Sequence, residues 1–145
     1  MSHFDPELIE KRLQELGETV SRLRRHQSVS VRSFRKDSDL QWVVEHGLQL
    51  AIQQVIDIAS HLLVASGFNN VSDYGEVIQK LVKHKVIPEV FGRKIIPMIN
   101  FRNILVHEYA VVDVEIVHII LRKNLDDFDL FANFVKKFLK KRRGG

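Results

Sequence analysis

Residues 40–65 read LQWVVEHGLQLAIQQVIDIASHLLVA, and this stretch decides the fold class. Its apolar residues recur at three- and four-residue steps, which is the spacing of an amphipathic helix. The members are Trp42, Val43, Leu50, Ile52, Val55, Ile56, Ala59, Leu62 and Leu63. Asp37, Ser38 and Asp39 stand just before the stretch and offer N-cap chemistry. We therefore predict one long helix over these residues, with Trp42 in the core.

The same spacing continues on both sides of this stretch. It predicts a helix over residues 6–26, with Asp5 as cap and Pro6 at the first position. Residues 27–36 form a loop or an extension of that helix. A short helix is predicted over residues 73–84, and another from Pro88 to about 106, which Pro97 should kink or restart. A single long helix follows Asp113 as cap. The prediction is one all-α domain, residues 1–145, folded as an up-down bundle of about five helices.

Composition narrows the class of protein. The chain has 145 residues, of which 45% are hydrophobic and 28% charged, as in folded globular proteins. It has no cysteine, which excludes disulfides, thiolate catalysis and cysteine-ligated zinc. No signal peptide is visible and no apolar run reaches the roughly 20 residues that span a bilayer. We therefore expect a cytoplasmic protein with no membrane partner.

The net charge is +4, and much of the excess lies in a basic C-terminal tail at about residues 136–145. The first interpretation of this tail is a solvated helix end whose cations suit the helix dipole. The alternative is a contribution to nucleic-acid affinity. The phenylalanines of the last helix are interpreted as core, with stacking of bases as the alternative.

The most informative stretch for function is FRNILVHEY, residues 101–109. On a helix of 100° per residue, Ile95, Ile99 and Val106 fall beside Arg102, followed by Asn103 and His107. A second apolar stripe, made of Met98, Phe101 and Leu105, lies roughly opposite. A helix with two apolar faces is buried on both sides. One face would pack in the bundle, and the face with the polar groups would pack against a second copy, which predicts a homodimer.

These polar groups suit cleavage of RNA without a metal. A neutral imidazole, here His107, can take the proton of a ribose 2′-hydroxyl near neutral pH. The guanidinium of Arg102 can stabilise the charge that builds on the phosphate. Asn103 can hold the imidazole or the substrate by hydrogen bonding. The structural alternative is that Arg102 pairs with a carboxylate and His107 is an ordinary histidine at a helix end.

A row of polar residues on the long helix offers supporting groups. Gln49, Gln53, Asp57 and His61 are spaced by four, so they share one face. Asp57 could pair with Arg102 or orient His107, with His61 as a further candidate; the alternative is a solvated ridge. Because Asp57 and His61 are only two ligands, no metal site is expected. No cofactor is predicted either.

The stretch from Phe101 to Tyr109 resembles the Arg-X4-His-X-Tyr motif of HEPN-domain proteins, specifically the HepT-like toxins. Three other stretches resemble that family too: residues 48–62, residues 74–88 around Tyr74-Gly75-Glu76 and Val86-Ile87-Pro88, and residues 112–120. The resemblance extends over roughly residues 6–140. It implies an all-α dimer with a composite active site, and a metal-independent endoribonuclease that leaves 2′,3′-cyclic phosphate ends.

The resemblance also implies partners and regulation. The protein would be the toxin of a type VII toxin–antitoxin system, whose antitoxin is a nucleotidyltransferase of the MntA type. That antitoxin would transfer AMP from ATP onto Tyr109, giving an O-AMP-tyrosine. The added bulk and negative charge beside Arg102 and His107 would exclude an RNA backbone. The alternative function is a non-catalytic helical partner of a minimal nucleotidyltransferase that binds or presents a nucleotide.

Overall fold

The structure, a computed structural model, describes residues 5–65, 74–107 and 112–144. Within these ranges the chain forms eight helical segments and no strand, which confirms the all-α prediction. The segments are α1 (Pro6–Arg24), α2 (Val31–Lys36), α3 (Ser38–Ala65), α4 (Tyr74–Lys83), α5 (Glu89–Asn100), α6 (Arg102–Val106), α7 (Val114–Lys123) and α8 (Leu125–Gly144).

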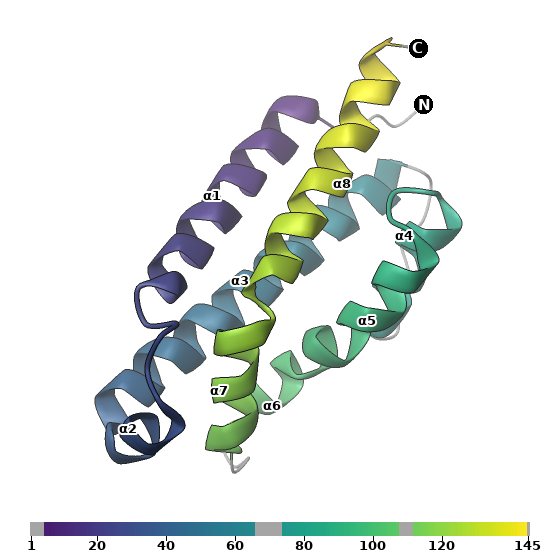
Figure 1. The fold of residues 1–145 in the computed structure, drawn as a ribbon. Helices are drawn as coiled ribbons and strands as arrows, with labels where there is room; N and C mark the ends of the chain where they lie inside the picture. The colour runs from purple at the N-terminus through teal and green to yellow at the C-terminus, as the bar shows by residue number, and fades with distance from the viewer. Residues whose placement is uncertain (1–4, 66–73, 108–111, 145) are drawn as a thin grey trace.

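The long helix α3 organises the bundle. It contacts each of the other helices, and α1 and α8 also contact one another, so these three long helices lie side by side (Figure 1). The pair α4 and α5 lies along another side of α3. The interior-facing side chains of α3 are fully or almost fully buried: Val44, Leu48, Ala51, Ile52, Val55, Ile58, Ala59, Leu62 and Leu63. The helix at the centre of the fold is the long helix that the sequence predicts over residues 40–65.

By length and composition, α3 is apolar enough over Ser38–Val64 to cross a membrane, although no uninterrupted apolar run in the sequence is that long. About half of this stretch is buried inside the bundle, and the central helix of a folded domain has the same length and composition. We interpret α3 as that central helix.

The sequence underestimates the number of helices at three points. The segment after α1 contains the separate helix α2, whose Ser30 cap accepts a hydrogen bond from Ser33. The predicted last helix is two helices, because Asn124 leaves the helical conformation (φ −113°, ψ 0°). Its side chain donates to the Asp127 carboxylate over 3.1 Å, and its carbonyl accepts from the Asp127 amide in the first turn of α8. The third break, at Phe101, separates α5 from α6.

Pro97 does not interrupt its helix where the sequence predicts. Helix α5 continues through Pro97 to Asn100, and the chain turns one residue later, at Phe101. Phe101 is buried and its amide donates to the carbonyls of Pro97 and Met98, so the turn is tight and nearly helical. The break therefore lies directly before Arg102 and makes it the first residue of α6.

Trp42 is the clearest exception to the predicted core. It is 71% exposed, and its ring stacks on His46 with a centroid distance of 6.0 Å. The neighbouring apolar residues Val43 and Leu50 are exposed too. An amphipathic pattern fixes the spacing of the apolar stripe but not how much of its width neighbouring helices cover.

Candidate functional site

The short helix α6 carries the polar groups that the sequence singles out. It packs on α3 and follows α5, while Phe101 anchors its start in the core. Arg102 is half-buried, whereas Asn103 is exposed. His107 is the C-cap of α6 and is also exposed. Its φ of −81° is still close to the helical value, so His107 leaves the backbone on the side of Asn103, one turn later.

Arg102 is held by side chains of two other helices. Its Nε donates a hydrogen bond of 2.6 Å to the amide oxygen of Gln53 on α3. The amide nitrogen of Gln53 in turn donates to the Asp57 carboxylate over 2.8 Å. On another side, the guanidinium carbon lies 4.9 Å from the centroid of the Tyr74 ring, the first residue of α4. Such a cation–ring contact contributes about 0.5–1 kcal/mol at a partly exposed site.

This arrangement leaves the reactive side of the guanidinium open. Within residues 5–65, 74–107 and 112–144, Nε is the only nitrogen of Arg102 that forms a side-chain hydrogen bond, and no carboxylate pairs with the guanidinium. The two terminal nitrogens are the pair that can grip a phosphate through two parallel hydrogen bonds. The alternative in which Arg102 serves a structural ion pair therefore has no support in the described part of the chain.

Asp57 has a different contact from the two that the sequence predicts. It neither pairs with Arg102 directly nor contacts His107 by a bond that the described residues show; it acts on Arg102 through Gln53. An amide can present either its oxygen or its nitrogen to a neighbour. By accepting from the amide nitrogen, Asp57 fixes the orientation in which the oxygen faces the arginine. His61, one turn further along α3, is exposed and makes no hydrogen bond to another described residue.

The apolar face that the sequence predicts to contact a second copy of the chain has fewer exposed residues in the structure. Ile95 and Ile99 belong to the core of this chain, so they cannot form that face. The apolar residues still exposed beside Arg102 are on α6, where Ile104 is 42% and Val106 37% exposed. The contact face for a second copy therefore reduces to α6 itself. The structure contains one chain and does not show the dimer.

Tyr109, the expected site of modification, falls outside the described residues. No group of three or more histidine, aspartate or glutamate side chains in the described ranges is arranged to hold a metal ion.

Two residues of the site are missing from the sequence-based set. Gln53 belongs to the polar row on α3, but a glutamine carries no charge to mark it as the partner of an arginine. Tyr74 starts a short helix whose packing on α3 and α5 could not be known from spacing. The signal that could have found Gln53 is its position one turn before Asp57 in the polar row of α3.

Comparisons with known proteins identify the family of this chain. The model of the family described as "Ribonuclease HepT-like" matches residues 16–135. The tRNA nuclease HepT of Aphanizomenon flos-aquae is 27% identical over 139 residues, which cover 96% of this chain and 95% of that protein. The mRNA nuclease HepT of Shewanella oneidensis is also 27% identical, over 103 residues that cover 71% of this chain and 77% of that protein.

Solved structures share the fold. The cytosolic protein YutE of Bacillus subtilis, of unknown function, superposes with a TM-score of 0.83 at 18% identity, covering 100% of this chain and 97% of that one. A tri-AMPylated HEPN toxin of Shewanella oneidensis in complex with its MNT antitoxin superposes with a TM-score of 0.81 at 22% identity, covering 92% and 99%. At these identities the structural likeness establishes the fold.

Proposed function

Because this chain belongs to the HepT-like ribonuclease family, we propose that it is a metal-independent endoribonuclease and the toxin of a type VII toxin–antitoxin pair, acting in the cytoplasm. The observation that carries the proposal is the fixed guanidinium of Arg102. Its Nε donates to Gln53, and Arg102 shares one short helix with Asn103, with His107 as the C-cap of that helix. A cation held in place before substrate arrives stabilises a charged transition state without a cost of reorganisation.

In the proposed reaction, His107 accepts the proton of a ribose 2′-hydroxyl. The 2′-oxygen forms a bond to the adjacent phosphorus, and the bond from phosphorus to the 5′-oxygen of the next nucleotide breaks. A proton, delivered by an imidazolium or by water, completes the leaving 5′-hydroxyl, and the other product is a 2′,3′-cyclic phosphate. Arg102 binds the phosphate oxygens, whose negative charge grows in the transition state. Asn103 donates or accepts a hydrogen bond beside the same phosphate.

The exposed position of α6 favours a site shared by two copies. Ile104 and Val106 are exposed beside Asn103 and His107, so covering these apolar side chains with a second α6 would bring two motif sets together. One copy could then supply the base while the other supplies a phosphate-binding cation. We propose this homodimer as the active form.

For regulation, we propose that a nucleotidyltransferase antitoxin of the MntA type transfers AMP from ATP to the Tyr109 hydroxyl and releases pyrophosphate. Support comes from the Shewanella oneidensis toxin, which is tri-AMPylated in its complex with an MNT antitoxin. Tyr109 follows His107 by two residues. An added phosphodiester there places negative charge where RNA phosphate would bind, and repels it.

The experiment compares wild type with Arg102→Ala and His107→Ala on a mixed RNA pool, with circular dichroism and light scattering as controls of fold and assembly. Each variant should lose at least about 100-fold in cleavage rate, since a positioned base and a charge-stabilising donor are each worth about that much. Retained cleavage in either variant contradicts the assignment. A folded wild type that binds the antitoxin but cuts no RNA would instead indicate the non-catalytic partner.

A further inference from the structure

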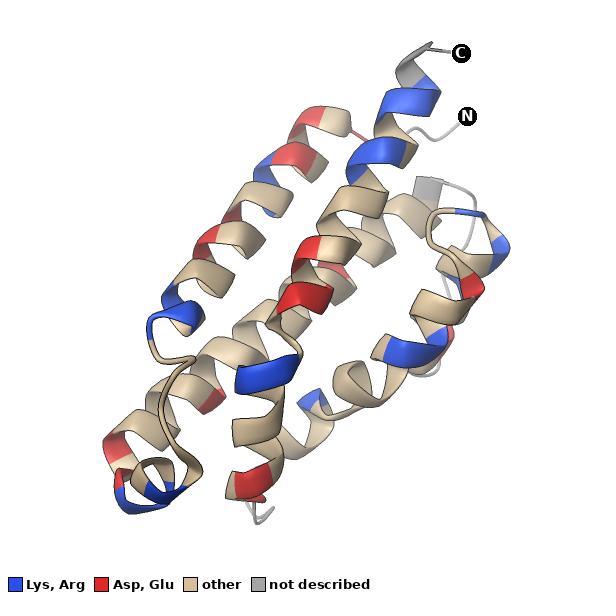
Figure 2. Cartoon of the chain, in the orientation of Figure 1, with Lys and Arg blue, Asp and Glu red and all other residues tan. Residues whose placement is uncertain are grey.

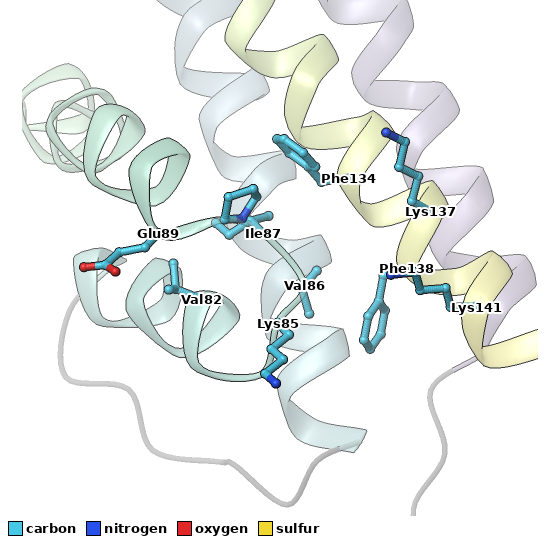
Figure 3. A pocket seen from close by; sticks show the side chains of 10 residues that line it. Val82, Lys85, Val86, Ile87, Glu89, Phe134, Lys137, Phe138 and Lys141 are labelled. Atoms are coloured by element: carbon cyan, nitrogen blue, oxygen red, sulfur yellow. The ribbon is translucent and has the colours of Figure 1, made fainter. Parts of the chain in front are cut away.

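A pocket with an apolar lining and a basic rim lies at the other end of α5 from the motif. It is a cavity of about 430 Å³ between the α4–α5 turn and α8 (Figure 3). Val86 and Ile87, both buried, contribute the apolar wall on the side of the turn. The volume is within the range of pockets that hold a small ligand or a single nucleotide. Nothing in the proposed cleavage reaction uses this pocket.

The rim of this pocket is basic. Lys85 stands on the turn, and Lys137 and Lys141 stand one turn apart on α8. Figure 2 shows basic residues gathered at the C-terminal end of α8 and at the α4–α5 turn. All three lysines are exposed, and none forms an ion pair within the described part of the chain. Glu89 also lines the pocket, and its carboxylate is directed away from α8 (Figure 3).

Two aromatic rings line the side of the pocket formed by α8. Phe134 packs against Phe91 with a centroid distance of 5.0 Å, so its ring is fixed from behind. Phe138 is half-buried, and the Arg142 guanidinium lies 5.6 Å from its ring centroid. Rings held at the edge of a positively charged groove are the arrangement on which single-stranded nucleic acid stacks its bases.

Lys85 occupies a backbone conformation that lysine disfavours. Its φ is 61°, the only positive value for a non-glycine residue among those described. The amide of Val86 donates to the Leu81 carbonyl and the amide of Lys85 to Val82, which is the helix-ending motif that normally places glycine at this position. A lysine kept where glycine fits better indicates a role for its side chain.

We infer that this pocket is a docking site for single-stranded RNA outside the cleavage site, where a base stacks on Phe138 and the neighbouring phosphates contact Lys85, Lys137 and Lys141. The inference rests on the proposed function for the identity of the polyanion. Three cations beside two rings match a phosphate backbone with exposed bases, which uses both the charges and the ring faces, whereas the carboxylates of an acidic peptide would use the charges alone. Helix α5 has 12 residues and therefore separates the pocket from α6 by roughly 18 Å. That is about five nucleotides of a stacked strand at 3.4 Å each.

The test measures binding to a fluorescein-labelled, 2′-O-methylated 20-nucleotide strand of mixed sequence. This RNA cannot be cleaved by attack of a 2′-hydroxyl, so binding is read without cleavage. The double variant Lys137→Gln/Lys141→Gln is compared with Lys136→Gln/Lys140→Gln, which removes the same charge from the same helix at positions that do not line the pocket. Fluorescence anisotropy is followed from 50 to 300 mM KCl.

The pocket variant should bind at least about 10-fold more weakly. Its slope of log affinity against log salt should fall by about 1.4, since each lost phosphate contact on a single strand contributes about 0.7. The control pair should change affinity less than about twofold. Phe138→Leu keeps the apolar packing and should still weaken binding at least about 5-fold through lost stacking.

Equal effects of the two lysine pairs would overturn the inference, because the tail would then act as diffuse charge. So would unchanged RNA affinity together with loss of the antitoxin complex, which would assign the pocket to a protein partner. Failure of the proposed function shows separately, as absent cleavage of unmodified RNA by wild type. That result leaves the binding measurements valid.

Discussion

Gln53 accepts the Nε hydrogen of Arg102 across 2.6 Å, which ties the motif helix to the central helix of the bundle. An arginine side chain loses about 2 kcal/mol of conformational entropy when it is fixed. A hydrogen bond to a charged group contributes roughly 1.5–3 kcal/mol, enough to offset that loss. The guanidinium is therefore held in place before RNA binds, and the cost of ordering it falls on folding rather than on catalysis.

The first prediction concerns this hydrogen bond. Gln53→Ala should lower kcat about 10- to 100-fold, because a displacement of a catalytic group by about 1 Å from its productive position can lower the rate up to 100-fold. Single-turnover cleavage of a labelled RNA measures the effect. Gln49→Ala, one turn earlier on α3, is the matched control and should cleave at nearly the wild-type rate. A Gln53→Ala enzyme as fast as this control would show that Arg102 needs no support from α3.

The second prediction separates orientation from charge at Asp57. Asp57→Asn keeps an oxygen that can accept from the Gln53 amide, so its cleavage rate should stay within about threefold of wild type. Asp57→Leu removes the acceptor and lets the amide turn its nitrogen toward Arg102, where two donors would face each other. We expect its rate to fall about 10-fold. If Asp57→Asn and Asp57→Leu are equally impaired, the negative charge of the carboxylate matters and the orientation of the Gln53 amide does not.

The helices that position this site follow from local sequence. The Asp5 carboxylate accepts from the amides of Glu7 and Leu8, and the Asp113 carboxylate accepts from those of Glu115 and Ile116, so these two predicted caps are confirmed. The capping residues act within three residues of themselves, and periodicity needs only one turn of neighbours. Both signals depend only on residues that are close together in the sequence, which is why spacing and caps predict the positions of the helices well.

The supporting contacts of the site could not be found in that way. Gln53 and Arg102 are 49 positions apart, and their contact depends on how α6 settles on α3. Asn124 shows the same limit on a smaller scale: its backbone leaves the helical conformation and ends a helix that the apolar spacing alone predicts to continue. Trp42 is exposed because no neighbouring helix covers it, a fact about packing that amphipathicity leaves open.

A third prediction concerns pH and Glu45. Partial burial raises the pKa of Glu45 above its ordinary value of about 4.5. Between the two values the folded protein binds the proton more readily than the unfolded chain does, so stability falls as pH rises through this window. Above the folded pKa that loss is complete. Glu45→Gln removes it and should be more stable than wild type at pH 7, with the advantage shrinking as the pH falls toward 4.

The measurement for Glu45 is the urea midpoint of wild type and variant at pH 4, 5, 6 and 7. Glu18→Gln removes an exposed carboxylate from α1 and serves as the charge-matched control. An advantage of Glu45→Gln that stays constant over this range would mean that the gain comes from packing or net charge. It would contradict the assignment to burial of the carboxylate.

The last prediction tests the strain at Lys85, where a φ of 61° costs a lysine roughly 1–2 kcal/mol. Lys85→Gly relieves that strain, while the greater freedom of glycine in the unfolded chain costs roughly 0.4–1 kcal/mol. The net gain should be about 0.5–1 kcal/mol, or about 2–4 °C in Tm. Lys83→Gly, two residues earlier at the end of α4, should instead lose about 1 kcal/mol, since helical glycine is unfavourable.

If the Lys85 side chain binds RNA, Lys85→Gly should combine a higher Tm with weaker binding of the 2′-O-methylated strand. Unfolding of the variant cannot then explain the weaker binding. A higher Tm with unchanged binding would leave the strained lysine without its proposed role.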